Sequence, residues 1–281
     1  DGNIHFNFSQ PIGADKEAAT DLLDSIKGEF EANDLLAADF PEVCEPIQKL
    51  EGIANRCKGQ TSGGVRTQIT WSATRITLPT IEGSLASGAT IRCAGITGRI
   101  RGMKHRKASG ENVRPTLFVA DDPQTDEAAG SATLTAKLER TLKGAVLGLA
   151  GPTQKMSGIM PCTVIRRNDL ADRLLDTKLS PEWNGERCKM LYALPKNLDL
   201  WEQYNEIRVA ELRAGRSLKK ATAFYRKNRK AMDAGARVGW DDRHNEDELS
   251  ALQHAMNLRF IDLWAFESEY QNNPPDDSAI D

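Results

Sequence analysis

The chain is 281 residues long and 40% hydrophobic, 27% charged and 6% aromatic, a globular composition that excludes disordered, collagen-like and membrane-spanning classes. Its 37 basic and 40 acidic side chains leave a net charge of -3, so nucleic acid or an anionic membrane would have to bind a local patch. The five cysteines are odd in number and form no C-x-x-C pair, which argues against disulfides and zinc and favours a reducing, cytosolic compartment.

The first elements predicted are a strand and a helix. Residues 4–8 alternate apolar and polar side chains as a strand does, and Pro11 and Gly13 are expected to end it. From Asp15 onward, apolar side chains recur every fourth residue opposite carboxylates and lysines. This spacing predicts an amphipathic helix with a buried stripe of Ala18, Leu22, Ile26 and Phe30.

Four further segments have the β-branched or apolar character of strands. Residues 67–71 and 75–78 predict a hairpin peripheral to the main sheet, and residues 90–94 predict a short strand. Residues 117–120 are continuously apolar, as is typical of a strand buried on both faces of a parallel sheet.

The second half of the chain changes character. Leu134, Leu138 and Leu142 mark a helix expected to end near Gly144, and a strand over residues 157–165 follows, where Pro161 indicates a bulge or an edge position. Strands that alternate with helices predict an α/β fold with a mostly parallel sheet. Beyond about residue 194 only helices are predicted, over residues 201–212, 218–230 and 245–257, the last opened by a capping box of Asn245 and Glu248.

The segment most informative about function follows the strand at residues 117–120. Asp121 and Asp122 come directly after it, so both carboxylates lie at the carboxyl end of a buried strand, where ligands bind in open α/β sheets. This is the layout of a Walker B motif. There the first carboxylate holds Mg²⁺, usually through water, and the second activates the water that attacks the γ-phosphate of ATP. The alternative is an ordinary Asx–Pro turn at Pro123.

The matching phosphate-binding loop, G-x-x-x-x-G-K-[ST], does not occur in these 281 residues. Residues 151–157 are a poor substitute, because Lys155 has no preceding glycine and the loop leads into a strand rather than a helix. Either the protein is no P-loop enzyme, or the loop lies before Asp1.

Two basic segments are candidates for binding phosphates. Residues 98–107 hold Arg99 and Arg101 among glycines, and either supply an arginine finger that stabilises transition-state charge or form a solvated loop. The second segment lies on predicted helices and either follows a DNA backbone or is an ordinary exposed face. It comprises Arg213, Arg216, Lys219, Lys220, Arg226, Lys227, Arg229 and Lys230.

Taken in order, these segments resemble one family. Residues 95–102 and 114–125 are similar to the phage terminase large subunit, the motor that packages DNA into viral capsids. Residues 158–163 stand where that family has its coupling motif, a strand end that senses the nucleotide. The family's ATPase region closes with F-x-x-E-Y-x-N-x-P, which Phe266, Glu269, Tyr270, Asn272 and Pro274 resemble.

The resemblance implies roles for individual residues. Asp121 would be the Walker B aspartate associated with Mg²⁺, and Asp122 stands where many members have a catalytic Glu, with Glu127 a weaker candidate for the base. Arg101, with Arg99 as the competing choice, would be an arginine finger offered to a neighbouring subunit.

The resemblance also implies an organisation, with Thr163 as the coupling residue. Residues 1–194 would form a partial ATPase core of the P-loop NTPase-like (ASCE) type, incomplete at its N-terminus, residues 195–272 a helical linker or lid subdomain, and residues 273–281 a linker tail. The family's phosphate loop and its RNase H-like nuclease are both missing from this sequence. We therefore expect these 281 residues alone to hydrolyse ATP poorly or not at all.

The implied cofactors are ATP and Mg²⁺. The implied partners are double-stranded DNA, the portal protein and the terminase small subunit, in a homo-oligomeric ring on the procapsid and without a membrane. The location would be the host cytoplasm, transiently at the procapsid portal. Two alternatives stay open at this point: another ASCE-type DNA-dependent ATPase, such as a helicase or repair motor, and a non-catalytic assembly module of the same fold.

Overall fold

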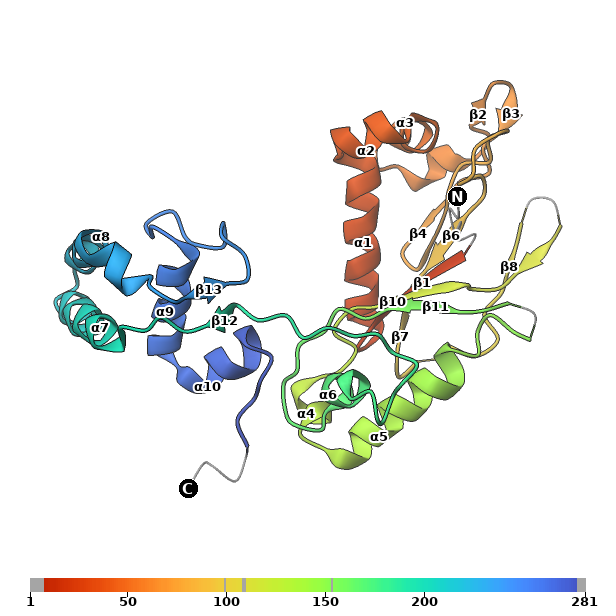
Figure 1. Cartoon of the computed structure of the whole chain (residues 1–281). Coiled ribbons are helices and arrows are strands. Elements are labelled where there is room, and N and C mark those ends of the chain that lie inside the picture. The colour runs from red at the N-terminus through yellow and green to blue at the C-terminus, as the bar shows by residue number, and fades with distance from the viewer. Residues whose placement is uncertain (1–7, 99, 108–109, 153, 277–281) are drawn as a thin grey trace. The chain divides into compact units, whose positions relative to one another are not determined.

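The computed structural model describes residues 8–98, 100–107, 110–152 and 154–276, which form two compact units, Asp1–Cys162 and Thr163–Asp281 (Figure 1). The division lies earlier in the chain than residue 194. The reason is that residues 163–193 pack within the second unit: the backbone N–H of Val164 donates to Asn272 Oδ1 at 3.0 Å, and that of Leu191 donates to Gln271 Oε1 at 2.8 Å.

The first unit is an α/β structure built on a mixed sheet. Seven of its described strands form one sheet in the order β11-β10-β1-β6-β5-β4, with β7 also paired to β1. The pairings of β1 with β10, β6 and β7, and of β10 with β11, are parallel, whereas β4–β5 and β5–β6 are antiparallel. The predicted α/β class with a mostly parallel sheet is confirmed. These strands are β1 (Phe8–Gly13), β4 (Thr70–Ser72), β5 (Arg75–Thr77), β6 (Thr90–Arg92), β7 (Ala94–Gly95), β10 (Leu117–Ala120) and β11 (Ser157–Ile159).

Strand β1 contains a proline in its middle. Most of the strand predicted at residues 4–8 lies outside the described residues. Strand β1 continues through Pro11 and ends at Gly13, so of the two residues expected to end it only Gly13 does. The carbonyl of Ile12 accepts from the Asp121 N–H at 3.0 Å, on the β10 side, so the neighbouring Pro11 turns its backbone toward the opposite side. On that side β1 pairs with β6 before Pro11 and with β7 after it. The proline, which has no N–H, therefore lies between the two pairings, where no hydrogen bond is lost.

Helix α1 (Lys16–Ala32) begins at Asp15, whose Oδ1 accepts from the Ala18 N–H at 2.9 Å. Its buried residues are Ala19 and Leu23, whereas Ala18 is exposed, so the predicted stripe was wrong by one residue at this end. A spacing of four advances about 400° around a helix and drifts by about 40° at each step. The face toward the sheet therefore requires spacings of four and three, as in Ala19, Leu23, Ile26 and Phe30.

The helix start lies close to the sheet because of a glycine. A Cβ on Gly95 would lie 2.4 Å from the carbonyl carbon of Asp15, so no larger residue fits at this position of β7. The other elements of this half are α2 (Asp34–Asp39), α3 (Pro41–Gln48), the 3₁₀ turn Ala54–Cys57, the hairpin β2 (Thr61–Ser62) with β3 (Val65–Arg66), and the ribbon β8 (His105–Arg106) with β9 (Asn112–Val113).

The hairpin predicted at residues 67–71 and 75–78 is β4–β5, shorter than expected and at one edge of the main sheet. Strand β10 has the predicted bounds, but only Phe118 and Ala120 are buried, and Leu117 and Val119 on its other face are half-buried.

Two helices and an edge strand follow β10. They are α4 (Asp126–Ala129), α5 (Ala132–Thr141) with a π-helical turn at Leu142–Val146, and β11. Strand β11 is exposed along its length at the other edge of the sheet and stops before Pro161, which agrees with the edge position that Pro161 indicated.

The second unit is mainly helical. A two-stranded sheet, β12 (Leu191–Ala193) with β13 (Arg237–Val238), corrects the expectation of helices only. Strand β13 is too short for a sequence pattern and is held by its partners, since the Gly239 N–H donates to the Met190 carbonyl at 2.9 Å. The helices are α6 (Leu170–Leu175), α7 (Leu198–Arg213), α8 (Lys219–Met232), α9 (Ala251–Ile261), α10 (Leu263–Ala265) and the π-helical turn Phe266–Tyr270.

An aromatic core joins α7, α8 and α9. Trp201 lies with its ring centroid 5.3 Å from that of Tyr204 and 5.1 Å from that of Tyr225, and its indole N–H donates to the Met232 carbonyl at 2.9 Å. Trp201, Tyr204 and Tyr225 are fully buried. No helix within the described ranges is long and apolar enough to cross a bilayer.

Helix α9 starts later than predicted. Its cap is Ser250, whose Oγ accepts from the Gln253 N–H at 3.2 Å, while Gln253 Oε1 accepts from the Leu249 N–H at 2.8 Å. Asn245 does donate to Glu248, but in a turn that precedes the helix, so the predicted capping box was misplaced. The other carboxylate oxygen of Glu248, Oε1, accepts from Asn257 Nδ2 of α9 at 2.8 Å.

Candidate functional site

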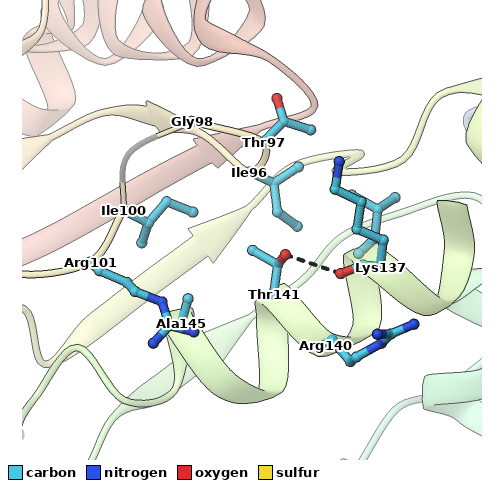
Figure 2. A pocket seen from close by; sticks show the side chains of 10 residues that line it. Ile96, Thr97, Gly98, Ile100, Arg101, Lys137, Arg140, Thr141 and Ala145 are labelled. Atoms are coloured by element: carbon cyan, nitrogen blue, oxygen red, sulfur yellow. Dashed lines mark hydrogen bonds between the residues drawn. The ribbon is translucent and has the colours of Figure 1, made fainter.

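The candidate site lies at the edge of the first unit's sheet where the parallel strands β1 and β10 end and their connections leave toward opposite sides. From β1 the chain passes through α1 to β6 on one side, and from β10 it passes through α4 and α5 to β11 on the other. Figures 1 and 2 both show α1 on one side of these strands and α5 on the other. Adjacent parallel strands whose connections depart in opposite directions form a topological switch point, where open α/β sheets bind ligands.

Asp121 and Asp122 follow β10 directly at this edge, and both are exposed. The Asp121 N–H continues the ladder with the Ile12 carbonyl at 3.0 Å, and the Asp122 N–H donates to the Pro161 carbonyl at 3.1 Å. Asp122 has a φ of 36°, in the left-handed region, where Asp and Asn are among the few residues other than glycine that occur. The backbone thus turns sharply at Asp122 and leaves two adjacent carboxylates at the strand end.

The residues after the acid pair have a structural role in starting α4. Thr125 caps the helix, with its Oγ1 accepting from the Ala128 N–H at 3.2 Å, and Asp126 and Glu127 lie in the first turn, where carboxylates stabilise a helix. Glu127, the weaker candidate for a base, is exposed in that turn.

A basic pocket lies on the other side of the end of β1 (Figure 2). Strand β7 pairs with β1 so that Gly95 is level with Gly13, and the Ile96 N–H donates to the Gly13 carbonyl at 2.9 Å. The segment that follows β7 and helix α5 enclose a cavity of about 390 Å³. The loop of this pocket and the acid pair therefore flank the same strand end, although neither Asp121 nor Asp122 lines the cavity.

Arg101, Lys137 and Arg140 supply the charge of this pocket, and no carboxylate is among its lining residues. Within the part of the chain that the structure describes, none of the three forms an ion pair, and Arg140 Nε donates only to the Ala136 carbonyl at 3.2 Å. Figure 2 shows Arg101 beside Ala145 and the Lys137 side chain extending toward Thr97. Such a pocket favours an anion.

Lys137 and Arg140 were not singled out from the sequence. Two cations three residues apart lie on neighbouring positions of one helix face, which is a usable signal, but the same spacing is common on solvated helices. This face of α5 differs from an ordinary solvated helix face only because residues such as Ile96 and Arg101 pack close to it and line the pocket with it.

The remaining predicted residues lie elsewhere. Arg99 is outside the described residues. Thr163 is half-buried beyond the end of β11 at Ile159 and is the first residue of the second unit. In the described ranges, no three His, Cys, Asp or Glu side chains are grouped closely enough to hold a metal ion by themselves.

Comparison with known proteins leaves the family open. No protein-family model matches the chain, and no curated protein matches it.

Proposed function

We propose that this chain is the ATPase motor portion of a viral DNA-packaging terminase large subunit, which couples ATP hydrolysis to translocation of double-stranded DNA into a procapsid. The observation that carries the proposal is the exposed pair Asp121–Asp122 at the carboxyl end of a central parallel strand, with Asp122 turned into the left-handed region. Its partners would be the portal protein and the terminase small subunit, in a homo-oligomeric ring.

The acid pair fits a magnesium site of the kind that phosphoryl-transfer enzymes use. Mg²⁺ prefers hard oxygen ligands and keeps several waters and phosphate oxygens, so one or two exposed carboxylates suffice on the protein side. Mg²⁺, when bound, neutralises charge on the phosphate oxygens. We assign Asp121 to holding the metal and Asp122 to orienting the attacking water and accepting its proton.

Binding of ATP needs more than this sequence holds. The lysine of a phosphate-binding loop is absent from the 281 residues, so the proposal requires such a loop from outside them. The isolated chain is accordingly expected to show little or no ATP turnover, and robust turnover would contradict the proposal.

The basic pocket supports Arg101 as the cation that stabilises transition-state charge. Arg101 is exposed, has no carboxylate partner among the described residues, and lines a pocket with no acidic residue in its lining. An arginine held in this way is available to a phosphate, including one bound by a neighbouring subunit.

The test is DNA-stimulated ATP hydrolysis by the complete protein carrying Asp121→Asn. We expect a loss on the order of 100-fold or more, because the substitution removes a charge positioned at the reacting phosphate. The matched control is Asp126→Asn, which neutralises an exposed carboxylate of the same segment in the first turn of α4 and should keep near-normal activity. Full activity of Asp121→Asn would rule out the Walker B assignment.

A further inference from the structure

A second basic cavity lies away from the strand end, on the antiparallel part of the first unit's sheet. Here β4, β5 and β6 turn Trp71, Ile76 and Ile91 toward the core that they share with α1. The alternate residues face the other way: Arg75 is the register partner of Arg92, and Thr77 that of Thr90. The face opposite α1 is thus lined by arginine and threonine rather than by apolar side chains.

The segment from Lys104 to Lys107 covers part of this face and encloses a cavity of about 390 Å³ with it. The cavity is lined by the permanent cations Arg75, Lys104, Arg106 and Lys107, together with His105 and three threonines. No carboxylate and no phenylalanine, tyrosine or tryptophan is among the lining residues, so the cavity offers mainly charge and hydroxyl groups.

The charges of this cavity are largely uncompensated. Arg75, Lys104 and Arg106 form no ion pair in the described part of the chain. Lys107 Nζ lies 3.7 Å from Glu111 Oε2, and the Glu111 side chain is 63% exposed, so this pair compensates little of the charge. The pKa of His105 is lowered first by burial and then by Arg75 and Lys107, so these two cations lie close enough to act on the ring.

The arrangement of the cations favours an extended polyanion over a compact one. All four residues from Lys104 to Lys107 line the cavity: His105 and Lys107 are half-buried, whereas Lys104 and Arg106 are exposed and form its rim. A single small anion would occupy the cavity and leave the rim cations unused. A phosphate backbone that enters the cavity and continues across the rim would contact both sets.

We infer that this cavity and its rim, residues Arg75 and Lys104–Lys107, form a binding surface for the phosphate backbone of double-stranded DNA. The choice of DNA as the source of the phosphates rests on the proposed function. Because the lining is dominated by cations and hydroxyl groups, the contact is expected to be independent of base sequence, since backbone contacts position the duplex without reading it.

The test measures binding of a short fluorescein-labelled DNA duplex to the 281-residue chain by anisotropy, between about 50 and 200 mM salt. The variant is Lys104→Gln with Arg106→Gln, two exposed rim cations. We expect its affinity to fall about tenfold or more at 100 mM salt, and the slope of log affinity against log salt to decrease by about 1 to 2, one for each lost phosphate contact. The matched control is Lys58→Gln with Arg66→Gln, which removes the same charge from exposed residues of the first unit that do not line the cavity.

Three outcomes would overturn the inference. One is an equal loss in both double variants, which would show a response to net charge alone. Another is a loss only in Lys227→Gln with Lys230→Gln, which would place the DNA on the exposed basic face of α8. The third is that Lys104→Gln with Arg106→Gln weakens the binding of inorganic triphosphate but not that of the duplex. This result would assign the cavity to a free phosphate compound.

The binding readout separates this inference from the proposed function. A loss of duplex affinity in the Lys104/Arg106 variant would support the binding surface whether or not Asp121→Asn impairs ATP hydrolysis. Conversely, a failed Walker B assignment leaves the anisotropy result unchanged.

Discussion

At the scale of single residues, Asp122 combines a position next to the proposed metal ligand with a backbone conformation that most residues avoid. Its φ of 36° crowds the Cβ of an L-residue, at a cost of about 1–2 kcal/mol, and local hydrogen bonding by Asp or Asn lowers this cost. Backbone outliers of this kind cluster at functional sites. The sequence motif thus coincides with one of the five positions in the described residues where a residue other than glycine has a positive φ.

The first prediction concerns substitutions of Asp122. Asp122→Gly and Asp122→Asn should leave thermal stability near that of the parent chain, whereas Asp122→Ala should be less stable than Asp122→Gly by about 1–2 kcal/mol, because alanine keeps the Cβ and lacks the polar group. Thermal unfolding followed by circular dichroism gives the order. An alanine variant as stable as the glycine variant would show that the conformation at this position carries no strain.

The second prediction concerns pH and His105. Burial, Arg75 and Lys107 lower the pKa of this histidine, so the unfolded chain takes up its proton first as the pH falls. The contribution of His105 to stability is therefore intact above about pH 6.5 and is lost as the pH falls below it.

His105→Gln should accordingly reduce the loss of stability between about pH 7.5 and pH 5.5, and His244→Gln, at an exposed histidine of the second unit, should not. Bound duplex should give the parent chain the opposite dependence of stability on pH, because a phosphate beside His105 favours the protonated ring. The affinity of the chain for the duplex should therefore rise as the pH falls. Thermal unfolding and anisotropy at matched pH values measure the two effects. An unchanged pH profile in His105→Gln would exclude the histidine as its source.

At the scale of elements, the pairing of β10 with β11 depends on a glycine. A Cβ on Gly158 would lie 2.3 Å from the Cε1 and Cζ atoms of the Phe118 ring, which is fully buried. The ring of a central-strand residue thus occupies the space where the edge strand would carry a side chain. This contact fixes the register in which Phe118 lies opposite Gly158.

The third prediction follows from this contact. Gly158→Ala should destabilise the first unit by about 1–3 kcal/mol, the usual cost of overpacking, and Phe118→Ala in the same chain should relieve part of that cost. The matched control is Gly28→Ala in α1, where a Cβ meets nothing within 4 Å and helix propensity predicts a gain of up to about 1 kcal/mol. Thermal unfolding measures both, and a neutral Gly158→Ala would contradict the packing argument.

Other elements show why sequence patterns place boundaries imperfectly. Helix α8 has no side-chain cap of its own at Leu218, and its first N–H groups are satisfied by Glu211 of α7, whose Oε2 accepts from the Lys220 and Ala221 N–H groups at 3.0 Å each. Such a cap comes from another helix and leaves no local signal. The Ser250 cap of α9 does have a local signature, but the chain offers a competing one at Asn245.

At the scale of the whole molecule, the chain holds two compact units, and the proposed motor needs further copies of itself. Arg101 lies in a pocket of the first unit without an acidic partner among the described residues, as expected of a side chain that acts on a phosphate held elsewhere.

The fourth prediction tests whether Arg101 acts on a neighbouring subunit. Complete protein carrying Arg101→Ala, mixed with parent protein, should lower DNA-stimulated ATP hydrolysis by more than the dilution of active subunits, because each variant subunit also disables its neighbour. Lys143→Ala is the control, since Lys143 is engaged with Glu139 at 2.9 Å and lies outside the pocket lining. A loss strictly proportional to the mixed fraction would show that Arg101 acts within its own subunit or not at all.

The sequence by itself determined the α/β class, the bounds of β10 and the acid pair that follows it, because these depend on short-range patterns of apolar, β-branched and acidic residues. Only the tertiary structure decided which side of β1 each neighbour takes, how the pocket of Arg101 forms with Lys137 and Arg140, and how Arg75 meets Lys104–Lys107. Both basic cavities join segments far apart in the chain. Their charge becomes a site only when packing sets the distances between side chains, and no local pattern encodes those distances.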